Sequence, residues 1–445
     1  MTEDRLPRSV GLVGAIAVLV GTTIGSGIFR VPATVASRLT EPGPVLLAWV
    51  LGGILALFGA LTLAELAAAF PRSGGIFAYL EEGFGPLPAF LFGWTQLTVA
   101  RAAALGGIAT VFAEYLNYFL GFTPQQVRWM AAAVILIVAF VNYIGVSRAS
   151  ALMNVATITK YAAMLGLALL IFVAGSGSSH NFTPLFTAAP RVPLLATALV
   201  SIMWAYDGWA DLSYMGGEIK NPAKNLPLAL IGGTLAIIVI YLTLNVAYIY
   251  VVPVPEMAQA KLIASTAAER VPLLGGAGGG VIAAVVMLSC FSSLNGSIMT
   301  NPRVFFAMAD RGLFFKGVAR VSPRFKSPSV AIWLAAILGA VYVLFNDFQQ
   351  LADRFILGLW PFYILSVIAV FVLRRKQPNL ERPYRTLGYP IVPIVFLLAA
   401  VFMVINALVT DPKNTGITFL IIGTGIPVYY IAKATGRFGA DARRS

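Results

Sequence analysis

Residues 21–29, with the sequence GTTIGSGIF, lie in the middle of the first long apolar run of the chain and decide how that run is interpreted. The stretch holds three glycines and three hydroxyl residues where a plain membrane anchor would carry Leu and Ile. Backbone groups released from a helix inside a bilayer need partners, so unwound backbone is tolerated there only beside a protein-lined cavity. The stretch therefore predicts a broken helix and a ligand, with close glycine-mediated helix packing as the alternative.

The two halves of such a broken helix offer opposite charges to a ligand. The half that begins after the break presents free N–H groups and a positive dipole end, which suit a carboxylate. The carbonyls that end the preceding half suit an ammonium. We therefore predict a zwitterion at the substrate-binding residues Thr22, Thr23, Ile24, Gly25, Ser26 and Gly27.

The composition of the chain is that of an integral membrane protein. Of its 445 residues, 59% are apolar and 11% are charged, and the mean hydropathy is +0.85. Soluble proteins have about 25% charged residues, so a soluble enzyme is excluded. A single cysteine, Cys290, allows no disulfide framework, and the single histidine, His180, allows no histidine-built metal cluster and is expected to be solvated. Phosphate-binding, zincin and hydrolase motifs are missing from the sequence, so we predict no catalysis, cofactor, metal or ATP-driven pumping.

Twelve long apolar runs predict an all-α protein with twelve transmembrane helices, because each crossing needs about 20 apolar residues. Their approximate limits are 10–36, 44–70, 86–120, 128–147, 152–175, 192–217, 228–252, 273–306, 328–346, 351–373, 389–409 and 415–433. Most of the 31 Lys and Arg residues then fall on the side of the N-terminus, which predicts cytoplasmic N- and C-termini in the cell membrane. This distribution explains the net charge of +13 through topology and anionic lipid, without nucleic acid.

The sixth run holds a second interruption, WAYDGW at residues 204–209, which places an acid beside a glycine in mid-membrane. Two interrupted spans that lie five apart predict two five-helix repeats of inverted topology. We assign these repeats to residues 10–175 and 192–373, preceded by a cytoplasmic segment, 1–9, and followed by two additional helices, 389–433, and a basic tail, 434–445.

Side chains around the second interruption are candidate ligand contacts: Trp204, Ala205, Tyr206, Asp207 and Gly208. Asp207 either contacts the ligand or, as the favoured interpretation, caps the second half of its helix. Trp204 and Tyr206 either close over a ligand or pack as ordinary core aromatics.

Lys160 lies deep in the fifth span, where an unpaired cation costs about 2.5–3.5 kcal/mol. We expect it to bind the loose carbonyls and hydroxyls of the first break, as a fixed cation in place of sodium, and the alternative is snorkelling to the interface. Arg101 in the third span has no assigned role, and the sequence offers only Glu114 or a carbonyl as its partner.

Three further sites carry polar residues within or at the ends of spans. Ser292 and Asn295 in the eighth span either line the pocket or form helix–helix hydrogen bonds. Glu65 and Glu218 are expected at the cytoplasmic face, paired with basic loop residues.

Five motifs together resemble the amino acid-polyamine-organocation superfamily and, within it, the L-type amino acid transporter family. They are GTTIGSGIF at 21–29; AEL at 64–66 with PRSGG at 71–75 and YLEE at 79–82; WAYDGW at 204–209; GEIKNP at 217–222 with NLP at 225–227; and SLNG at 293–296 with PR at 302–303. The likeness covers nearly the whole chain.

The resemblance implies the leucine-transporter fold, alternating access and specific contacts to the substrate. Backbone at residues 24–27 is implied to hold the substrate carboxylate, and carbonyls near Thr22, Thr23, Ala205 and Tyr206 to hold the amine. Trp204 takes the position of an aromatic gate, where many relatives have Phe. Lys160 is implied to replace a second sodium site, which makes transport sodium-independent.

The same resemblance implies something about partners. The loop at 121–128 has no Cys, so the disulfide that links animal relatives to a single-span glycoprotein subunit cannot form. The chain also departs from animal relatives at Ala102, which follows Arg101 where they have Pro. The sequence thus predicts an exchanger of neutral L-amino acids that works without such a subunit. The alternatives are proton-coupled uptake, with Lys160 carrying the proton, and a membrane sensor that binds an amino acid without moving it.

Overall fold

The computed structural model describes residues 8–435 except 145, 301, 316, 319–321 and 323–328, and omits the side chains of 145–158, 302–303, 306 and 310. Most of the predicted end segments, 1–9 and 434–445, lie outside the described residues. The same holds for some of the basic residues that fall on the side of the N-terminus, such as Arg5, Lys316 and Arg324.

The first apolar run is broken where the sequence predicts. Helix α1 (Leu12–Thr23) and helix α2 (Gly27–Arg38) meet at an angle of 44°, and residues 24–26 between them are not helical. The break is shorter than the predicted stretch 22–27, since Thr22 and Thr23 belong to the last turn of α1, where the Ile24 N–H still bonds to the Val20 carbonyl and both threonine hydroxyls donate to the Leu19 carbonyl.

The sixth run is also interrupted, but its second half differs from the predicted half-helix. Helix α9 (Val192–Tyr206) ends at Asp207, and two short 3-10 helices follow, Trp209–Tyr214 and Gly216–Glu218. Gly208 has φ = 116°, a left-handed conformation that turns the chain out of the α9 axis. The 3-10 turns pack next to α1 and α10, so the chain stays inside the bundle without a regular helix.

Eight helices or helix groups of the described residues are long and apolar enough to cross a membrane, and the bent α1–α2 pair makes a ninth. Three shorter apolar helices, Thr159–Ala174, Val192–Tyr206 and Ser329–Phe345, lie where the remaining predicted runs fall. The protein is therefore an all-helical, multi-pass membrane protein, while the count of twelve crossings stays a prediction.

The other segments of the apolar runs are α3 (Pro42–Ala69), α5 (Pro86–Thr95) joined to α6 (Arg101–Leu120) by a π-helical turn at Gln96–Ala100, α7 (Pro124–Ile144), α8 (Val146–Ala174), α10 (Pro222–Val251), α13 (Gly278–Thr300), α15 (Ser329–Phe345), α16 (Phe348–Lys376), α17 (Ile391–Thr410), and α18 (Pro412–Gly423) with α19 (Gly425–Ala434).

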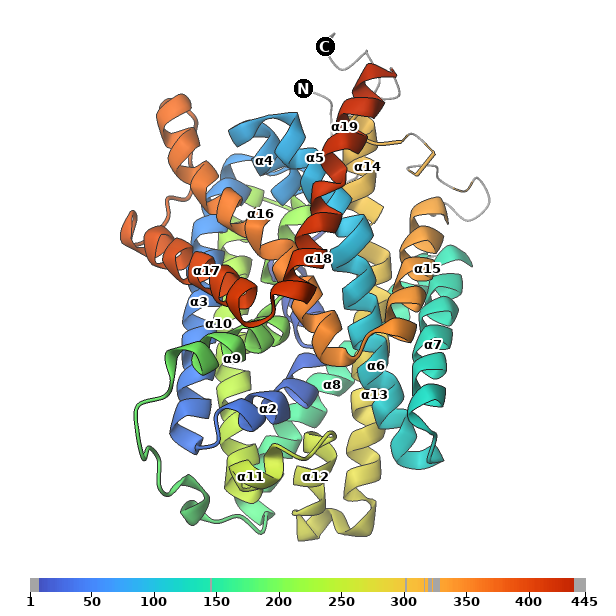
Figure 1. The fold of residues 1–445 in the computed structure, drawn as a ribbon, viewed down its shortest axis with the longest axis vertical. Helices are drawn as coiled ribbons and strands as arrows, with labels where there is room; N and C mark the ends of the chain where they lie inside the picture. The colour runs from blue at the N-terminus through green and yellow to red at the C-terminus, as the bar shows by residue number, and fades with distance from the viewer. Residues whose placement is uncertain are drawn as a thin grey trace.

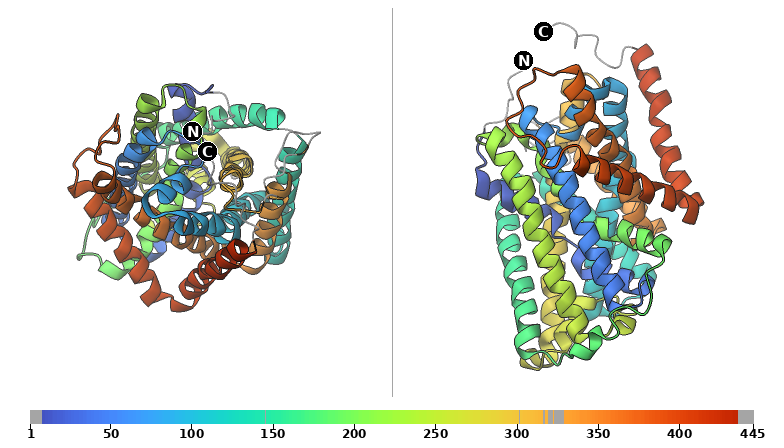
Figure 2. Two further views of the ribbon diagram at one scale, coloured as in Figure 1. Left: turned by 90° about the horizontal axis from the view of Figure 1, so that it is seen from above. Right: turned by 90° about the vertical axis from the view of Figure 1, so that its left-hand side faces the viewer.

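Short helices close the two ends of the bundle. Helices α4 (Ile76–Phe84) and α14 (Pro302–Asp310) lie at the same end as α19, and α11 (Val254–Met257) and α12 (Ile263–Glu269) lie at the opposite end (Figure 1). The last helices, α17 to α19, run along the outside of the bundle in both views of Figure 2. Their outward side chains are apolar, with Leu398 67% and Val409 75% exposed, as expected for a surface in contact with lipid.

The two interrupted helices lie against each other inside this bundle. Helix α2 packs against α9, α1 packs against α10, and α6 packs against α13 and α16. His180 is exposed on the connection before α9, as predicted. This packing leaves the break of α1–α2 facing the break after α9.

Candidate functional site

A small cavity lies between the two interruptions. Its volume is about 50 Å³, and it is lined by Thr22, Thr23, Gly25, Ser26, Gly27, Arg101, Ala104, Ile108, Trp204, Asp207, Gly208, Asp211, Ser293, Ser297 and Phe355. Eight of the predicted site residues line it. Ile24, Ala205, Tyr206, Ser292 and Asn295 do not.

The start of α2 presents unused backbone donors to this cavity. Ser26 is the N-cap residue and makes no side-chain cap bond, and within the first turn the N–H of Phe29 donates to the Ser26 carbonyl at 3.2 Å, so the N–H groups of Gly27 and Ile28 are left without a side-chain cap. Gly27 permits this arrangement, because a Cβ at this position would collide with the Cα of Ala205. The cavity is thus bordered by a helix N-terminus of the kind that binds carboxylates.

Lys160 binds the other side of the break, as the sequence predicts. Its fully buried Nζ donates hydrogen bonds to the carbonyl oxygens of Gly21 at 2.8 Å and Ile24 at 2.6 Å. The snorkelling alternative is therefore wrong. Ile24 contributes through this carbonyl, while its side chain is buried away from the cavity.

Tyr241 joins the two interrupted helices, a role that no sequence signal indicated. Its hydroxyl lies 3.2 Å from the carbonyl oxygen of Thr23 and 2.9 Å from that of Ala205. Both carbonyls lie at the end of a helix, and that of Thr23 also accepts from the N–H of Gly25 at 2.9 Å. Tyr241 comes from the uninterrupted α10, where an apolar run gives no reason to single out one tyrosine.

The two aromatic residues of the second interruption take different positions. Trp204 lines the cavity, lies 3.3 Å from Ser26 Oγ through its Nε1, and meets Phe348 and Phe355 edge-to-face. Tyr206 points away from the cavity, packs against Trp49 and Tyr241, and donates to the Trp49 carbonyl. For Tyr206 the structure therefore agrees with the second alternative, packing among core aromatic residues.

Asp207 lines the cavity and does not occupy the predicted capping position. The N-cap of the following 3-10 helix is Gly208. The Asp207 carboxylate instead accepts a hydrogen bond from the Tyr363 hydroxyl at 2.8 Å. Tyr363 belongs to α16, so this bond ties the second interruption to a helix distant in sequence.

Arg101 finds its partner in a residue that the sequence analysis did not single out. Its Nη2 donates to Asp211 Oδ1 at 3.1 Å, and its guanidinium lies over the Tyr214 ring. Glu114, the predicted candidate, pairs instead with Arg30 at 3.0 Å. Asp211 lies in the 3-10 turn that replaces the expected half-helix, and this geometry aims it at α6.

The polar stretch of α13 divides between two roles. Asn295 accepts a hydrogen bond from Asn142 of α7 at 2.7 Å, which confirms the helix–helix alternative for this residue. Ser292 is buried outside the cavity lining. Their neighbours Ser293 and Ser297 line the cavity in their place, because they lie on the face of α13 that is turned toward α1.

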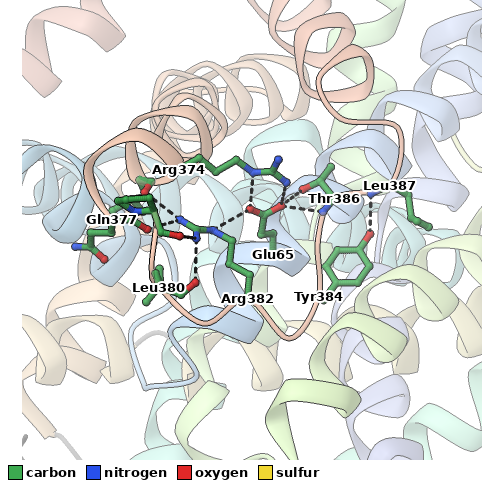
Figure 3. Close-up of polar contacts among 10 residues, drawn as sticks. Glu65, Arg374, Gln377, Leu380, Arg382, Tyr384, Thr386 and Leu387 are labelled. Carbon is green, nitrogen blue, oxygen red and sulfur yellow. Dashed lines mark hydrogen bonds and ion pairs between the residues drawn. The ribbon is translucent and has the colours of Figure 1, made fainter.

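Glu65 forms a buried ion cluster at one end of the bundle (Figure 3). Its carboxylate accepts two bonds from Arg374, at 2.9 and 2.7 Å, and two from the N–H and hydroxyl of Thr386, both at 2.8 Å. Arg382 lies 3.5 Å away and also binds the carbonyls of Leu373, Leu380 and Gln377. The expected pairing of Glu65 with basic residues is confirmed. Glu218 is half-buried at the end of the second interruption, where its carbonyl binds the N–H of Val10.

These features define a class of protein. A multi-pass helical bundle that surrounds a small polar cavity, at the meeting point of two interrupted helices, is built to hold a small polar solute inside the membrane.

Comparison with known proteins identifies the solute class. A family model described as amino acid permease matches residues 10–432. The serine/threonine exchanger SteT of Bacillus subtilis (strain 168) is 33% identical over 96% of this chain and 98% of its own length. The b(0,+)-type amino acid transporter 1 of Homo sapiens is 34% identical over 96% and 88%, and the human cystine/glutamate transporter is 32% identical over 96% and 85%. The chain belongs to the amino acid permease family of the amino acid-polyamine-organocation superfamily, and it is an amino acid transporter, not an enzyme.

Proposed function

We propose that the protein is a sodium-independent exchanger of neutral L-amino acids that works by alternating access. The observation that carries this proposal is the cavity between the two breaks. The end of α1 at Thr22 and Thr23, the start of α2 at Gly27, and the residues that follow α9, Asp207 and Gly208, lie on its borders. A zwitterion satisfies both sets of dipoles at once.

In this proposal the backbone at residues 24–27 holds the substrate carboxylate. Carbonyls near Thr22, Thr23, Ala205 and Tyr206 hold the amine, and Trp204 serves as the aromatic gate. Trp204 is supported in this role by its place in the lining, beside Phe355. Ser292 and Asn295 have no place in the pocket, since Ser293 and Ser297 line it.

Sodium independence rests on Lys160. Its ammonium lies between the carbonyls of Gly21 and Ile24, where it supplies the fixed positive charge that a bound cation would otherwise bring. Both carbonyl dipoles point toward this charge and stabilise it. Hydrogen bonds to the charged form of an amine favour that form, which supports the role of a fixed cation.

The larger architecture is part of the same proposal. We assign the leucine-transporter fold, with inverted repeats at 10–175 and 192–373, because breaks occur in the first and sixth of twelve apolar segments. Both termini are proposed to be cytoplasmic in the cell membrane. The transporter is also proposed to work without a disulfide-linked subunit, since the only cysteine, Cys290, is buried in α13.

Counterflow in liposomes tests this function. Purified protein should take up labelled amino acid much faster when unlabelled amino acid is trapped inside, and replacing sodium with choline should change nothing. Equal uptake into empty vesicles would refute exchange. Uptake driven by an imposed pH gradient alone would select proton coupling, and thermal stabilisation by amino acids without any flux would select a sensor.

A further inference from the structure

A second and larger cavity, which we call the outer cavity, lies at the far end of α2. Its volume is about 300 Å³, against about 50 Å³ for the central cavity between the two breaks. Helices α2, α9 and α16 contribute to both cavities, but no residue lines both, and the ends of α17 and α18 border only the outer one. The outer cavity is therefore a separate site.

The walls of the outer cavity carry charges of both signs. The charged residues that line it are Arg38, Asp347, Asp353, Arg354 and Asp411. Two of them bond to neutral side chains: Arg38 donates to Ser201 Oγ at 2.8 Å, and Asp353 accepts from Gln349 Nε2 at 2.7 Å. Charges that are removed from water need partners of opposite charge, and here a ligand can supply them.

Two buried atoms of this wall have no hydrogen-bond partner among the described residues. They are Gln349 Oε1, an acceptor, and Arg354 Nε, a donor. Both residues lie in the first two turns of α16, and both line the outer cavity. A buried polar atom without a partner is unfavourable, so such atoms usually bind a ligand or an ordered water. The wall thus offers an acceptor to an ammonium and a donor to a carboxylate.

The size and composition of the outer cavity limit what can occupy it. Each water-sized group needs about 10–15 Å³, so about 300 Å³ accommodates a whole amino acid together with water. The lining includes the hydroxyl groups of Thr197, Thr410 and Thr418 and few apolar side chains, which disfavours a ligand held by apolar contacts. A metal ion is disfavoured as well, since the described residues contain no group of three His, Cys, Asp or Glu side chains placed to hold one.

We propose that the outer cavity binds a second amino acid molecule by its two charged ends, with the ammonium at Asp353 and Gln349 and the carboxylate at Arg354. The inference rests on the transported class of solute, which the family shows, and not on the proposed exchange. Because α1 begins on the side of the N-terminus, α2 ends on the opposite side, so an amino acid passes this cavity on its way to or from the central one.

An aromatic contact lies between the two sites. Val200 lines the outer cavity and Trp204 lines the central one, and these residues lie four apart on one face of α9. Trp204 also meets Phe348 and Phe355 of α16 edge-to-face. A molecule in the outer cavity is therefore held one helical turn away from the residue proposed as the gate.

Equilibrium binding to the full chain in detergent tests this inference. Labelled L-serine, L-alanine and L-leucine are each titrated to saturation, and we expect two molecules of at least one of them per chain. Neither n-propylamine nor propionate should displace the outer molecule as alanine does, because each satisfies only one end of the site. One molecule per chain with all three amino acids, or displacement by n-propylamine as strong as by alanine, would overturn the proposal.

Arg354→Gln tests the site itself. Glutamine has no guanidinium to meet a carboxylate, so the affinity for the outer molecule should fall at least about tenfold. The central molecule should bind as in wild type, since Arg354 does not line the central cavity. Loss of both molecules together, or of neither, would overturn the inference. Ala407→Phe fills the outer cavity without removing a charge and should give the same result if Arg354→Gln does not fold.

Arg128→Gln is the matched control, because Arg128 donates to the Leu344 carbonyl at 3.4 Å and lines neither cavity. Both molecules should bind to this variant as they do to wild type, and loss of the outer one would overturn the assignment to Arg354.

A lipid headgroup with an ammonium is the other source of such a ligand. Retention of phosphatidylethanolamine by wild type but not by Arg354→Gln, with one amino acid per chain, would assign the cavity to lipid and overturn the inference. Failure of the proposed function has a different signature, since the detergent-solubilised chain should bind two molecules whether or not counterflow shows exchange.

Discussion

Replacing Lys160 with Met removes a buried ammonium while keeping a side chain of similar length. Lys160 Nζ makes hydrogen bonds of 2.8 and 2.6 Å to the carbonyls of Gly21 and Ile24. A hydrogen bond to a charged group contributes about 1.5–3 kcal/mol, so the two bonds together stabilise this form of the break by about 3–6 kcal/mol. The cavity-facing backbone of residues 24–27 depends on that form.

The effect on binding follows from the population of the competent form. Taking about 3 kcal/mol, the lower end of this range, the apparent affinity falls by at most about 150-fold, and by less if the competent form is in excess over other forms before the substitution. We expect a loss between about tenfold and 150-fold for every amino acid alike, because Lys160 supports the backbone that would hold the carboxylate and amine common to all of them. Binding of labelled amino acid to detergent-solubilised protein measures this loss directly.

Lys376→Met is the matched control for this substitution. Lys376 Nζ also donates to a backbone carbonyl, that of Gly83 at 3.3 Å, but it lies at the end of α16 and does not line the cavity. Its affinity should equal that of wild type. Unchanged binding by Lys160→Met, or an equal loss in the control, would refute the reasoning that links Lys160 to the break.

Three further substitutions test other parts of the structure. Glu65→Gln breaks the buried cluster with Arg374 and should destabilise the protein by about 3–5 kcal/mol, which lowers the thermal unfolding midpoint. Its control, Glu82→Gln, breaks a more exposed ion pair and should change the midpoint little. Equal shifts of the midpoint in both variants would contradict this. Gly27→Ala should abolish exchange, because its Cβ collides with Ala205, while Gly166→Ala, with open space around it, should exchange as wild type does; an active Gly27→Ala would show that the helices separate there. Tyr241→Phe should reduce the initial rate of exchange by about tenfold through loss of the hydroxyl that joins α1 to α9. Its control, Tyr248→Phe, should keep the wild-type rate, because the buried Tyr248 hydroxyl of the same helix has no partner among the described residues. Similar rates in both variants would exclude a role for the Tyr241 hydroxyl in joining the helices.

Much of the site was open to prediction because it depends on local chemistry. Glycines and hydroxyl residues inside an apolar run are costly in lipid unless the helix breaks there, and both breaks were located from this argument. The cation Lys160 was assigned to the carbonyls of the first break for the same reason, since a buried charge must have partners.

Other parts of the site depend on how helices rotate and meet. Tyr241 and Tyr363 reach the site from uninterrupted helices. Asp211 lies two residues after WAYDGW, but its direction depends on the 3-10 turn there. Ser293 lines the cavity while Ser292 does not. Glu114 lies on the same helix as Arg101 but pairs with Arg30. The true partner, Asp211, could not be predicted, because it reaches Arg101 only through the 3-10 helix that replaces the expected half-helix.

The sequence by itself determined that this protein lies in a lipid bilayer, where its helices break and that each buried charge needs a partner. All three follow from the cost of transferring single residues into lipid. The tertiary structure alone decided which side chain supplies each partner and which faces line the cavity. Such pairing depends on the rotation of one helix against another, and an apolar run that is buried on nearly all sides leaves no record of that rotation in its sequence.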